Sequence, residues 1–399
     1  MASRRGFLFG SVGSVACTAL FGSREALGAA SEGEPAAIPA TTYRSRVAAI
    51  QLELRKRDLA GLVIVSVEGY DTRYVAGHAP GVLLIAEAGE PILFAPGRPS
   101  TWLKDVRQER DLESMLTRCA EQLSELKADR AAIAIAGEFG WASRAKLAAA
   151  LPQARFVEGD EIQDALRLIK DEFEIALMRR AQQVSDAQIL AGKTAIRPGR
   201  TDREVLAETV KAALLQGMDL ESSRHLIGYG PGTDDLWSPL TGRRIASGEV
   251  LNFEGIVYYD HYVIETPVTF AVGKVSAKQE ELARINFEAL QAGLGAVKAG
   301  VPLASVVDAS NTVLRRHGFD KMIRRHGHFS GLANNDRPSF DAGIKSGMSL
   351  EQGMTMSYHT TITLPTKEAI VVAGRELLVT KSGCEMFSSV PLTALVQAG

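Results

Sequence analysis

This sequence is poor in the features that mark several specialised classes of protein. Cysteine occurs only three times in 399 residues, as Cys17, Cys119 and Cys384. Their spacing matches neither a zinc motif nor a disulfide framework, although a single Cys119–Cys384 bridge stays open. The formal net charge is only −2, so no charge excess points to nucleic acid or to an anionic membrane as a partner. No apolar run after the N-terminal segment reaches transmembrane length, which leaves a globular protein long enough for two domains.

The N-terminal segment has the pattern of an export signal. A Ser-Arg-Arg-Gly-Phe-Leu sequence at 3–8 is followed by a weakly apolar run at 9–21 and by small residues at 26–30 that suit cleavage. We therefore predict a twin-arginine (Tat) signal peptide over 1–30, with the Tat translocase as a partner during export. The mature protein is then expected to be periplasmic or secreted. Residues 31–41 are rich in Ala, Glu and Pro and predict a linker.

Residues 42–163 predict a compact α/β domain. Val47, Ile50 and Leu54 recur at helical spacing and predict a helix over 43–57. Short apolar runs separated by Gly and Pro turns predict strands. We expect strands at 61–66, 72–77, 82–85, 91–94 and 131–135 and a second helix at 109–126.

Residues 164–399 predict a larger α+β domain. Apolar positions at helical spacing alternate with β-branched runs that are bounded by turn residues. The expected helices are 164–191, 201–216, 279–299 and 303–317, and the expected strands are 250–254, 256–259, 262–272, 354–363, 370–372 and 376–380. Helices on one side of antiparallel hairpins make an α+β architecture.

The segment 325–339 carries two of the seven histidines, His326 and His328, beside glycines and before an Asp-Arg-Pro turn. Its Gly-rich and polar composition predicts a loop that presents side chains. Imidazoles next to glycines suit a metal site or an acid–base site. A solvated surface loop is the alternative interpretation.

Two carboxylates and two imidazoles extend this pattern. Glu254 and Glu265 lie eleven residues apart (265 − 254), around a turn at 259–261. A hairpin brings such residues together, and like charges side by side need a proton or a cation between them. His328 and His359 each lie beside a predicted strand. Two carboxylates with two imidazoles can form a first-row metal site.

Three short stretches carry a family resemblance. They are 327–332 (Gly-His-Phe-Ser-Gly-Leu), 350–354 (Leu-Glu-Gln-Gly-Met) and 378–385 (Leu-Val-Thr-Lys-Ser-Gly-Cys-Glu). At these points the C-terminal domain resembles the pita-bread fold of methionine aminopeptidase, prolidase, aminopeptidase P and creatinase. The N-terminal domain resembles the smaller domain of the prolidase and creatinase branch, down to the Asp-Thr-Arg-Tyr at 71–74. The resemblance implies a pita-bread domain preceded by a smaller creatinase-type α/β domain, and a homodimer.

The chain departs from the residues that this family uses for its dinuclear metal site. At the metal-ligand positions of the family, Glu254 and Glu265 replace the two aspartates and His328 keeps the histidine. His359 stands at the position of the first glutamate ligand, and Gly374 falls at about the position of the second. Asn335 replaces the histidine on the substrate side, and Trp237 lies near the position of the upstream catalytic histidine. Glycine has no side chain with which to bind a metal. A standard dinuclear site is therefore not expected.

The first hypothesis for the remaining residues is a mononuclear metal site made by Glu265, His328 and His359, with Glu254 as a further ligand. Two imidazoles and one carboxylate suit Fe, Zn or Mn. The protein would then hydrolyse a C–N bond of a peptide or of a small amino-acid-like molecule.

The second hypothesis is a metal-free, creatinase-like hydrolase in which His328, His359 and Glu265 transfer protons. Arg337 or Arg73 would hold a substrate carboxylate, although either arginine could instead be a solvated surface residue. The third hypothesis is a non-catalytic protein that binds a ligand on an enzyme fold. For an enzyme, the substrate contacts that we expect are Asn335, Trp237, Arg337 and Arg73. For a binding protein, Trp237 would instead belong to an aromatic pocket.

Overall fold

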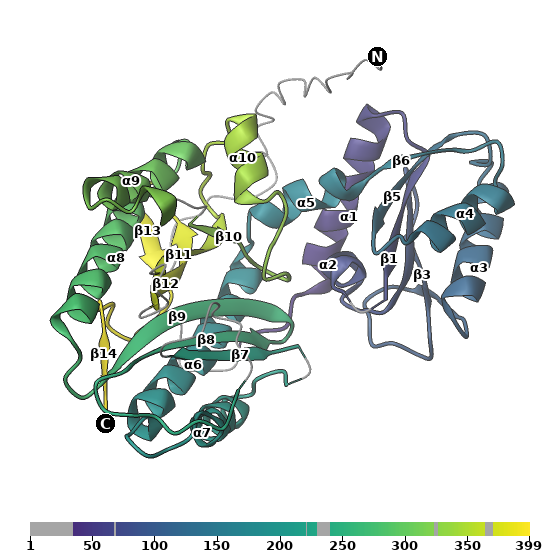
Figure 1. The fold of residues 1–399 in the computed structure, drawn as a ribbon. Helices are drawn as coiled ribbons and strands as arrows, with labels where there is room; N and C mark the ends of the chain where they lie inside the picture. Colours follow the sequence, from purple (N-terminus) through teal and green to yellow (C-terminus); the bar gives the residue numbers. More distant parts are fainter. Residues whose placement is uncertain (1–34, 68, 221, 230–239, 323–325, 364–369) are drawn as a thin grey trace, which may run out of the picture.

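The computed structural model describes residues 35–399 except 68, 221, 230–239, 323–325 and 364–369. The predicted signal peptide, the start of the linker and Trp237 lie outside the described residues. Figure 1 shows two lobes side by side, the N-terminal lobe in purple and blue and the C-terminal lobe in teal to yellow. Within the described part of the chain, no helix combines the length and the apolar character needed to cross a membrane.

The N-terminal lobe is built on a six-stranded sheet with strand order β4-β3-β2-β1-β5-β6. Its strands are β1 (Gly61–Ser66), β2 (Gly81–Ala86), β3 (Ile92–Ala95), β4 (Asp105–Gln108), β5 (Ala132–Gly137) and β6 (Arg155–Glu158), and its helices are α1 (Ala40–Lys56), α2 (Asp71–Ala76), α3 (Leu112–Glu125) and α4 (Trp141–Ala150). β1 is buried on both faces: Leu62 and Ile64 belong to the core that contains α1, and Val63 and Val65 belong to the core that contains α3. Alternate residues of a strand point to opposite faces, so a continuous apolar run fits this central position.

The C-terminal lobe contains two four-stranded sheets, with orders β14-β9-β8-β7 and β10-β11-β12-β13. Its strands are β7 (Arg224–Tyr229), β8 (Val250–Tyr259), β9 (Tyr262–Val272), β10 (Gly327–Phe329), β11 (Thr355–Thr363), β12 (Ile370–Val379), β13 (Cys384–Met386) and β14 (Val396–Ala398). Its helices are α6 (Glu172–Ala195), α7 (Asp202–Leu215), α8 (Ala277–Ala296), α9 (Leu303–Arg316) and α10 (Phe340–Ser346), and α5 (Asp160–Leu168) connects the two lobes and contacts α1 and β5. β9 and β12 contact each other, α6 packs on β8 and β9, and α8 packs on β11 and β12. The two sheets therefore face each other with helices outside, as Figure 1 shows.

The single helix predicted over 164–191 is wrong, because two helices, α5 and α6, occupy this stretch. The helical structure is interrupted at Lys170, whose backbone N–H donates to the carbonyl of Gly353. Asp171 then caps α6, and its side chain accepts from the backbone N–H of Glu174 in a capping box. The Asp-x-x-Glu pattern was visible in the sequence. The domain boundary predicted at 163/164 falls within α5.

The strand predicted at 72–77 is also wrong, because this segment forms the helix α2. The side chain of Thr72 donates to the carbonyl of His78, and Gly77 ends the helix in the left-handed region at φ 69°. Elsewhere, the strand pairs predicted at 250–259 and 370–380 are the continuous strands β8 and β12. Cys119 and Cys384 are both free, so the open bridge is not formed.

Candidate functional site

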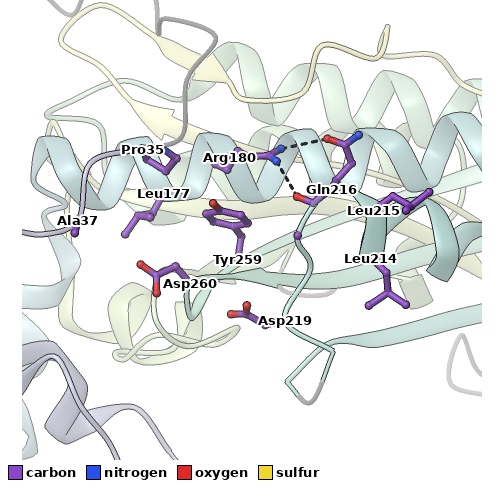
Figure 2. A pocket seen from close by; sticks show the side chains of 11 residues that line it. Pro35, Ala37, Leu177, Arg180, Leu214, Leu215, Gln216, Asp219, Tyr259 and Asp260 are labelled. Carbon is purple, nitrogen blue, oxygen red and sulfur yellow. Dashed lines mark hydrogen bonds between the residues drawn. The ribbon is translucent and has the colours of Figure 1, made fainter. Parts of the chain in front are cut away.

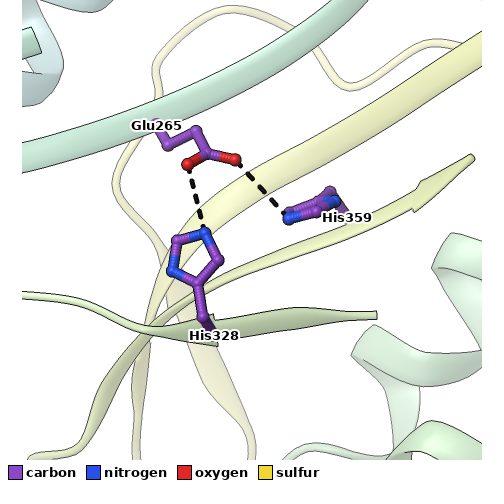
Figure 3. A group of neighbouring side chains, drawn as sticks. All are labelled: Glu265, His328 and His359. Atoms are coloured by element: carbon purple, nitrogen blue, oxygen red, sulfur yellow. Dashed lines mark hydrogen bonds and ion pairs between the residues drawn. The ribbon is translucent and has the colours of Figure 1, made fainter. Parts of the chain in front are cut away.

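Three of the predicted site residues meet where the two sheets of the C-terminal lobe face each other. Glu265 comes from β9, His328 from β10 and His359 from β11, and Figure 3 shows the carboxylate between the two imidazoles. One ligand atom from each residue lies within 4.8 Å of the others. The distance from His328 Nε2 to Glu265 Oε2 is 3.1 Å, and that from His359 Nε2 to Glu265 Oε1 is 3.5 Å. We call these three residues the Glu-His-His cluster.

The strand register explains why the two histidines share a face. His328 pairs with Ser357 across β10 and β11, and His359 lies two residues further along β11. Residues two apart on a strand point to the same side of the sheet. His328 is therefore held on a strand, whereas the sequence predicted a loop for the whole segment 325–339. A strand fixes an imidazole more rigidly than a solvated loop does.

Glu254 lies beside Glu265, as the hairpin pattern predicted. Burial and the adjacent charge of Glu265 raise the pKa of Glu254 well above its ordinary value. Burial also acts to raise the pKa of Glu265, but the hydrogen bond and charge of His328 and the charge of His359 outweigh it, so that pKa is lowered. Glu254 is therefore the protonated member of this pair and Glu265 the ionised one.

His328 has a defined orientation. Its Nδ1 lies 3.3 Å from the carbonyl oxygen of Phe329, and its Nε2 faces Glu265. Burial acts to lower the pKa of His328, but the hydrogen bond and charge of Glu265 outweigh it and raise this pKa above its ordinary value. When the Nε2 proton leaves, the Nδ1–H still donates to the carbonyl oxygen of Phe329, and the Nε2 lone pair points into the cluster. This arrangement fits a metal-binding imidazole.

His359 and Gly374 are matched to each other. They face each other across β11 and β12. A Cβ atom at Gly374 would lie 2.4 Å from the Cβ of His359 and 2.7 Å from the Cγ of Pro267. A side chain at position 374 is therefore excluded while His359 and Pro267 keep their places. Gly374 contributes no metal ligand, and the absence of a side chain there leaves space for the imidazole of His359, which belongs to the cluster.

Asn334 is a cluster contact that the sequence did not predict. Its Nδ2 donates to Glu265 Oε2 at 2.9 Å. The predicted substrate contact Asn335, one residue further, is exposed. The two asparagines have the same chemistry, so the sequence alone does not distinguish them. The backbone of the loop decides which amide turns inward.

Glu376 is a second residue that the sequence reasoning missed. It is fully buried and pairs with Ser357 across β11 and β12, so it lies in the same row of residues as His328. The hydroxyl of Ser330 donates to its carboxyl group. Burial raises the pKa of Glu376 to about 8. The available signal was one carboxylate inside the apolar run of 370–380.

The predicted arginine contacts lie away from the cluster. Arg337 is 43% exposed and forms ion pairs with Asp160 and Asp164. Arg73 lines a different cavity, whose lining includes no residue of the Glu-His-His cluster. Trp237 falls outside the described residues. The structure thus brings together Glu254, Glu265, His328 and His359, and it adds Asn334 and Glu376.

Comparisons with known proteins agree with this architecture. The family model of metallopeptidase family M24 matches residues 176–381, a range that contains the whole Glu-His-His cluster. The fold is similar to that of an Xaa-Pro dipeptidase from Bacillus anthracis, with a TM-score of 0.80 and 22% identity over 89% of this chain and 99% of that one. It is also similar to the dipeptidase PepE from Mycobacterium ulcerans, with a TM-score of 0.79 and 23% identity over 90% of this chain and 99% of that one.

A relative known from its sequence is the uncharacterized peptidase MW1651 of Staphylococcus aureus (strain MW2). It is 24% identical over 313 residues, which cover 77% of this chain and 87% of the relative. The structural likenesses support the predicted pita-bread fold, and the family match covers more than half of the 399 residues. The chain therefore belongs to metallopeptidase family M24, a family of hydrolases.

Proposed function

We propose that this protein hydrolyses a C–N bond in a peptide or a small amino-acid-like molecule and that it uses one divalent metal. Glu265, His328 and His359 would hold the ion, which could be Fe, Mn or Zn. The observation that carries the proposal is the approach of their three ligand atoms to within 4.8 Å of one another. Two imidazoles and one carboxylate leave coordination positions for water and substrate.

The neighbouring residues favour one ion over two. Glu254 is the protonated partner of Glu265, and Gly374 has no side chain to offer. A bound metal at the cluster would polarise a substrate carbonyl or lower the pKa of a water molecule. The chain itself would keep Glu265 ionised through its contacts with His328 and His359, and Asn334 would hold one oxygen of this carboxylate in place.

Elemental analysis of the purified protein tests the metal. We expect about one transition-metal ion per chain in the wild type and none in the His328→Ala/His359→Ala variant. His317→Ala is the matched control, since His317 caps the C-terminal end of α9 and pairs with Glu288 and not with the cluster. If the wild-type protein contains no metal after it has been produced through its own export route, the proposal is contradicted.

A metal-free hydrolase is the second candidate, and one observation favours it. Both ring nitrogens of His328 have hydrogen-bond partners within the protein, as a protonated imidazole requires. His328, His359 and Glu265 would then serve as proton-transfer groups. Turnover of Xaa-Pro dipeptides that survives complete removal of metal would support this candidate. If no substrate is turned over and a ligand still binds, the third hypothesis of a binding protein gains support.

We further propose that the protein is exported by the twin-arginine route and acts in the periplasm or outside the cell. An Arg4→Lys/Arg5→Lys variant should remain in the cytoplasm with its N-terminus uncleaved, as fractionation and N-terminal sequencing would detect. We also propose a homodimer, which light scattering of the purified protein would detect. Asn335, Arg337 and Trp237 stay predicted substrate contacts.

A further inference from the structure

A cavity lies between the N-terminal lobe and the tip of the β8–β9 hairpin. Its volume is about 410 Å³, within the range of small-molecule sites. Tyr43 on α1, Arg73 on α2 and His78 line it from the N-terminal lobe, and Asp260 and His261 line it from the hairpin turn.

This cavity is separate from the Glu-His-His cluster. Tyr262, which also lines the cavity, and Glu265 are three residues apart on β9. Residues an odd number of positions apart on a strand point to opposite faces of the sheet. The lining of the cavity also contains none of the three cluster residues, so a ligand bound there would lie at the tip of the hairpin and not on the cluster.

Arg73 is the distinctive residue of this cavity. The side chain is half-buried, and it forms no hydrogen bond and no ion pair with the residues that the structure describes. Burial lowers the pKa of its guanidinium, while Asp260 and Asp219 act on it only as more distant charges. A desolvated cation is unfavourable until an anion pairs with it, and a guanidinium matches the geometry of a carboxylate.

A neighbouring groove provides a comparison within the same molecule (Figure 2). This groove, of about 600 Å³, contains Arg180 and also reaches Asp260. Here the guanidinium already has partners: it donates to the carbonyl of Gln216 at 2.8 Å and lies 5.1 Å from the ring centre of Tyr259. The guanidinium of Arg180 therefore already has partners within the protein, whereas that of Arg73 would obtain one from a bound ligand.

We propose that the cavity around Arg73 binds a free amino acid. Arg73 would pair with the carboxylate, and Asp260 on the facing wall would attract the ammonium group. The opposite charges of the two walls favour a zwitterion over a simple anion. Peptide hydrolysis releases free amino acids, so this ligand class is also the product class of the proposed reaction. The assignment itself rests on the cavity and is independent of that reaction.

Titration calorimetry of the mature protein with glycine, proline, acetate and methylammonium, at constant ionic strength, tests the proposal. We expect an amino acid to bind, acetate to bind more weakly and methylammonium not to bind. Arg73→Gln should weaken amino-acid binding by about tenfold or more. Arg180→Gln is the matched control and should leave the affinity unchanged. Asp260→Asn should reduce amino-acid binding to the level of acetate and leave acetate binding intact.

Two results would overturn the assignment. The first is the absence of binding, or binding that Arg73→Gln does not weaken. The second is Arg73-dependent binding of inorganic phosphate as tight as that of the amino acids, which would indicate a general anion site. Arg73→Gln should keep the wild-type melting temperature without ligand and the wild-type metal content. Wild-type protein that contains no metal but still binds amino acids through Arg73 would therefore count against the proposed function and not against this site.

Discussion

The molecule contains two buried clusters of charge that differ in the kind of cation they hold. At the junction of the lobes, Arg167 pairs with Asp71 at 3.0 Å and Lys170 pairs with Asp336 at 3.1 Å. We call these four residues the junction cluster. In the Glu-His-His cluster, the charged partners of Glu265 among the described residues are two imidazoles.

This difference separates structure from function. In the junction cluster each cation already has a carboxylate partner within the protein, and neither arginine nor lysine is a usual metal ligand. Imidazoles charge only when they take up protons, and they bind a metal when they do not. In the junction cluster, side chains alone neutralise the carboxylates. In the Glu-His-His cluster, bound protons or a metal ion must supply the positive charge.

The two clusters are also connected. Arg167 also pairs with Asp336, which lies two residues after Asn334. A Cβ at Gly331 would lie 2.6 Å from Asp336 Oδ2, so the glycine allows this close approach. The junction cluster thereby fixes the loop that brings Asn334 to Glu265. A structural cluster positions a functional one.

The largest predicted effect is on the junction cluster. Lys170→Met should lower the free energy of unfolding by about 3–5 kcal/mol, because it leaves buried Asp336 with only one of its two cations. Urea denaturation measures this change. Arg44→Gln, which removes an exposed pair with Glu90, should change stability far less. A loss below about 1 kcal/mol for Lys170→Met would contradict the view that the junction cluster stabilises the fold.

The opposite behaviour is predicted for Glu265→Gln. Removal of this carboxylate should weaken metal binding by at least about 100-fold, since even residues that only orient a metal ligand contribute 10–100-fold. The stability of the metal-free protein should change little, because His328 can release its proton once the carboxylate is gone and then leaves no uncompensated buried charge. Cobalt titration with a competing chelator measures the affinity, and Glu288→Gln on the surface of α8 is the control. Unchanged affinity would show that Glu265 is not a ligand.

The two asparagines allow a sharper test of how the loop serves the cluster. Asn334→Ala should weaken metal binding by about 10–100-fold, because Glu265 loses a hydrogen bond that orients it. Asn335→Ala, one residue away and exposed, should leave the affinity unchanged. Equal effects of the two substitutions would indicate that the loop as a whole matters and not the contact of Asn334.

Sequence reasoning reached the cluster through chemistry and periodicity. The separation of Glu254 and Glu265 around a turn predicted their hairpin, and β9 has the predicted bounds. The motif at 327–332 pointed to His328. The choice between Asn334 and Asn335 was out of reach, because it depends on the pairing of Asp336 with Lys170, 166 residues away in the chain. No local pattern encodes such a contact.

The break between α5 and α6 and the role of Glu376 were missed for different reasons. The helix break had a local signal in the cap at Asp171, which the apolar periodicity outweighed. The sequence signal for Glu376 was weak, because a single carboxylate in a strand usually faces solvent. Its burial depends on the second sheet, which covers that face.

Glu376 predicts a pH dependence of stability. Burial raises its pKa from 4.5 to about 8 in the folded protein. Between these values the folded state keeps a proton that the unfolded chain has released, so the free energy of unfolding falls as pH rises. The slope is at most about 1.4 kcal/mol for each pH unit. Urea denaturation of metal-free protein between pH 5 and 8 should show a smaller decline in Glu376→Gln and the wild-type decline in Glu351→Gln.

The smallest effect is expected at Arg337, which pairs with Asp164 at 2.9 Å and with Asp71 of the junction cluster at 3.6 Å but is 43% exposed. Arg337→Gln should lower the free energy of unfolding by less than about 1 kcal/mol, because water and salt screen an exposed pair. Urea denaturation at low and high salt measures this. A loss as large as that of Lys170→Met would mean that burial is not what distinguishes these two cations. Weaker substrate binding with unchanged stability would instead support the predicted role of Arg337 as a substrate contact.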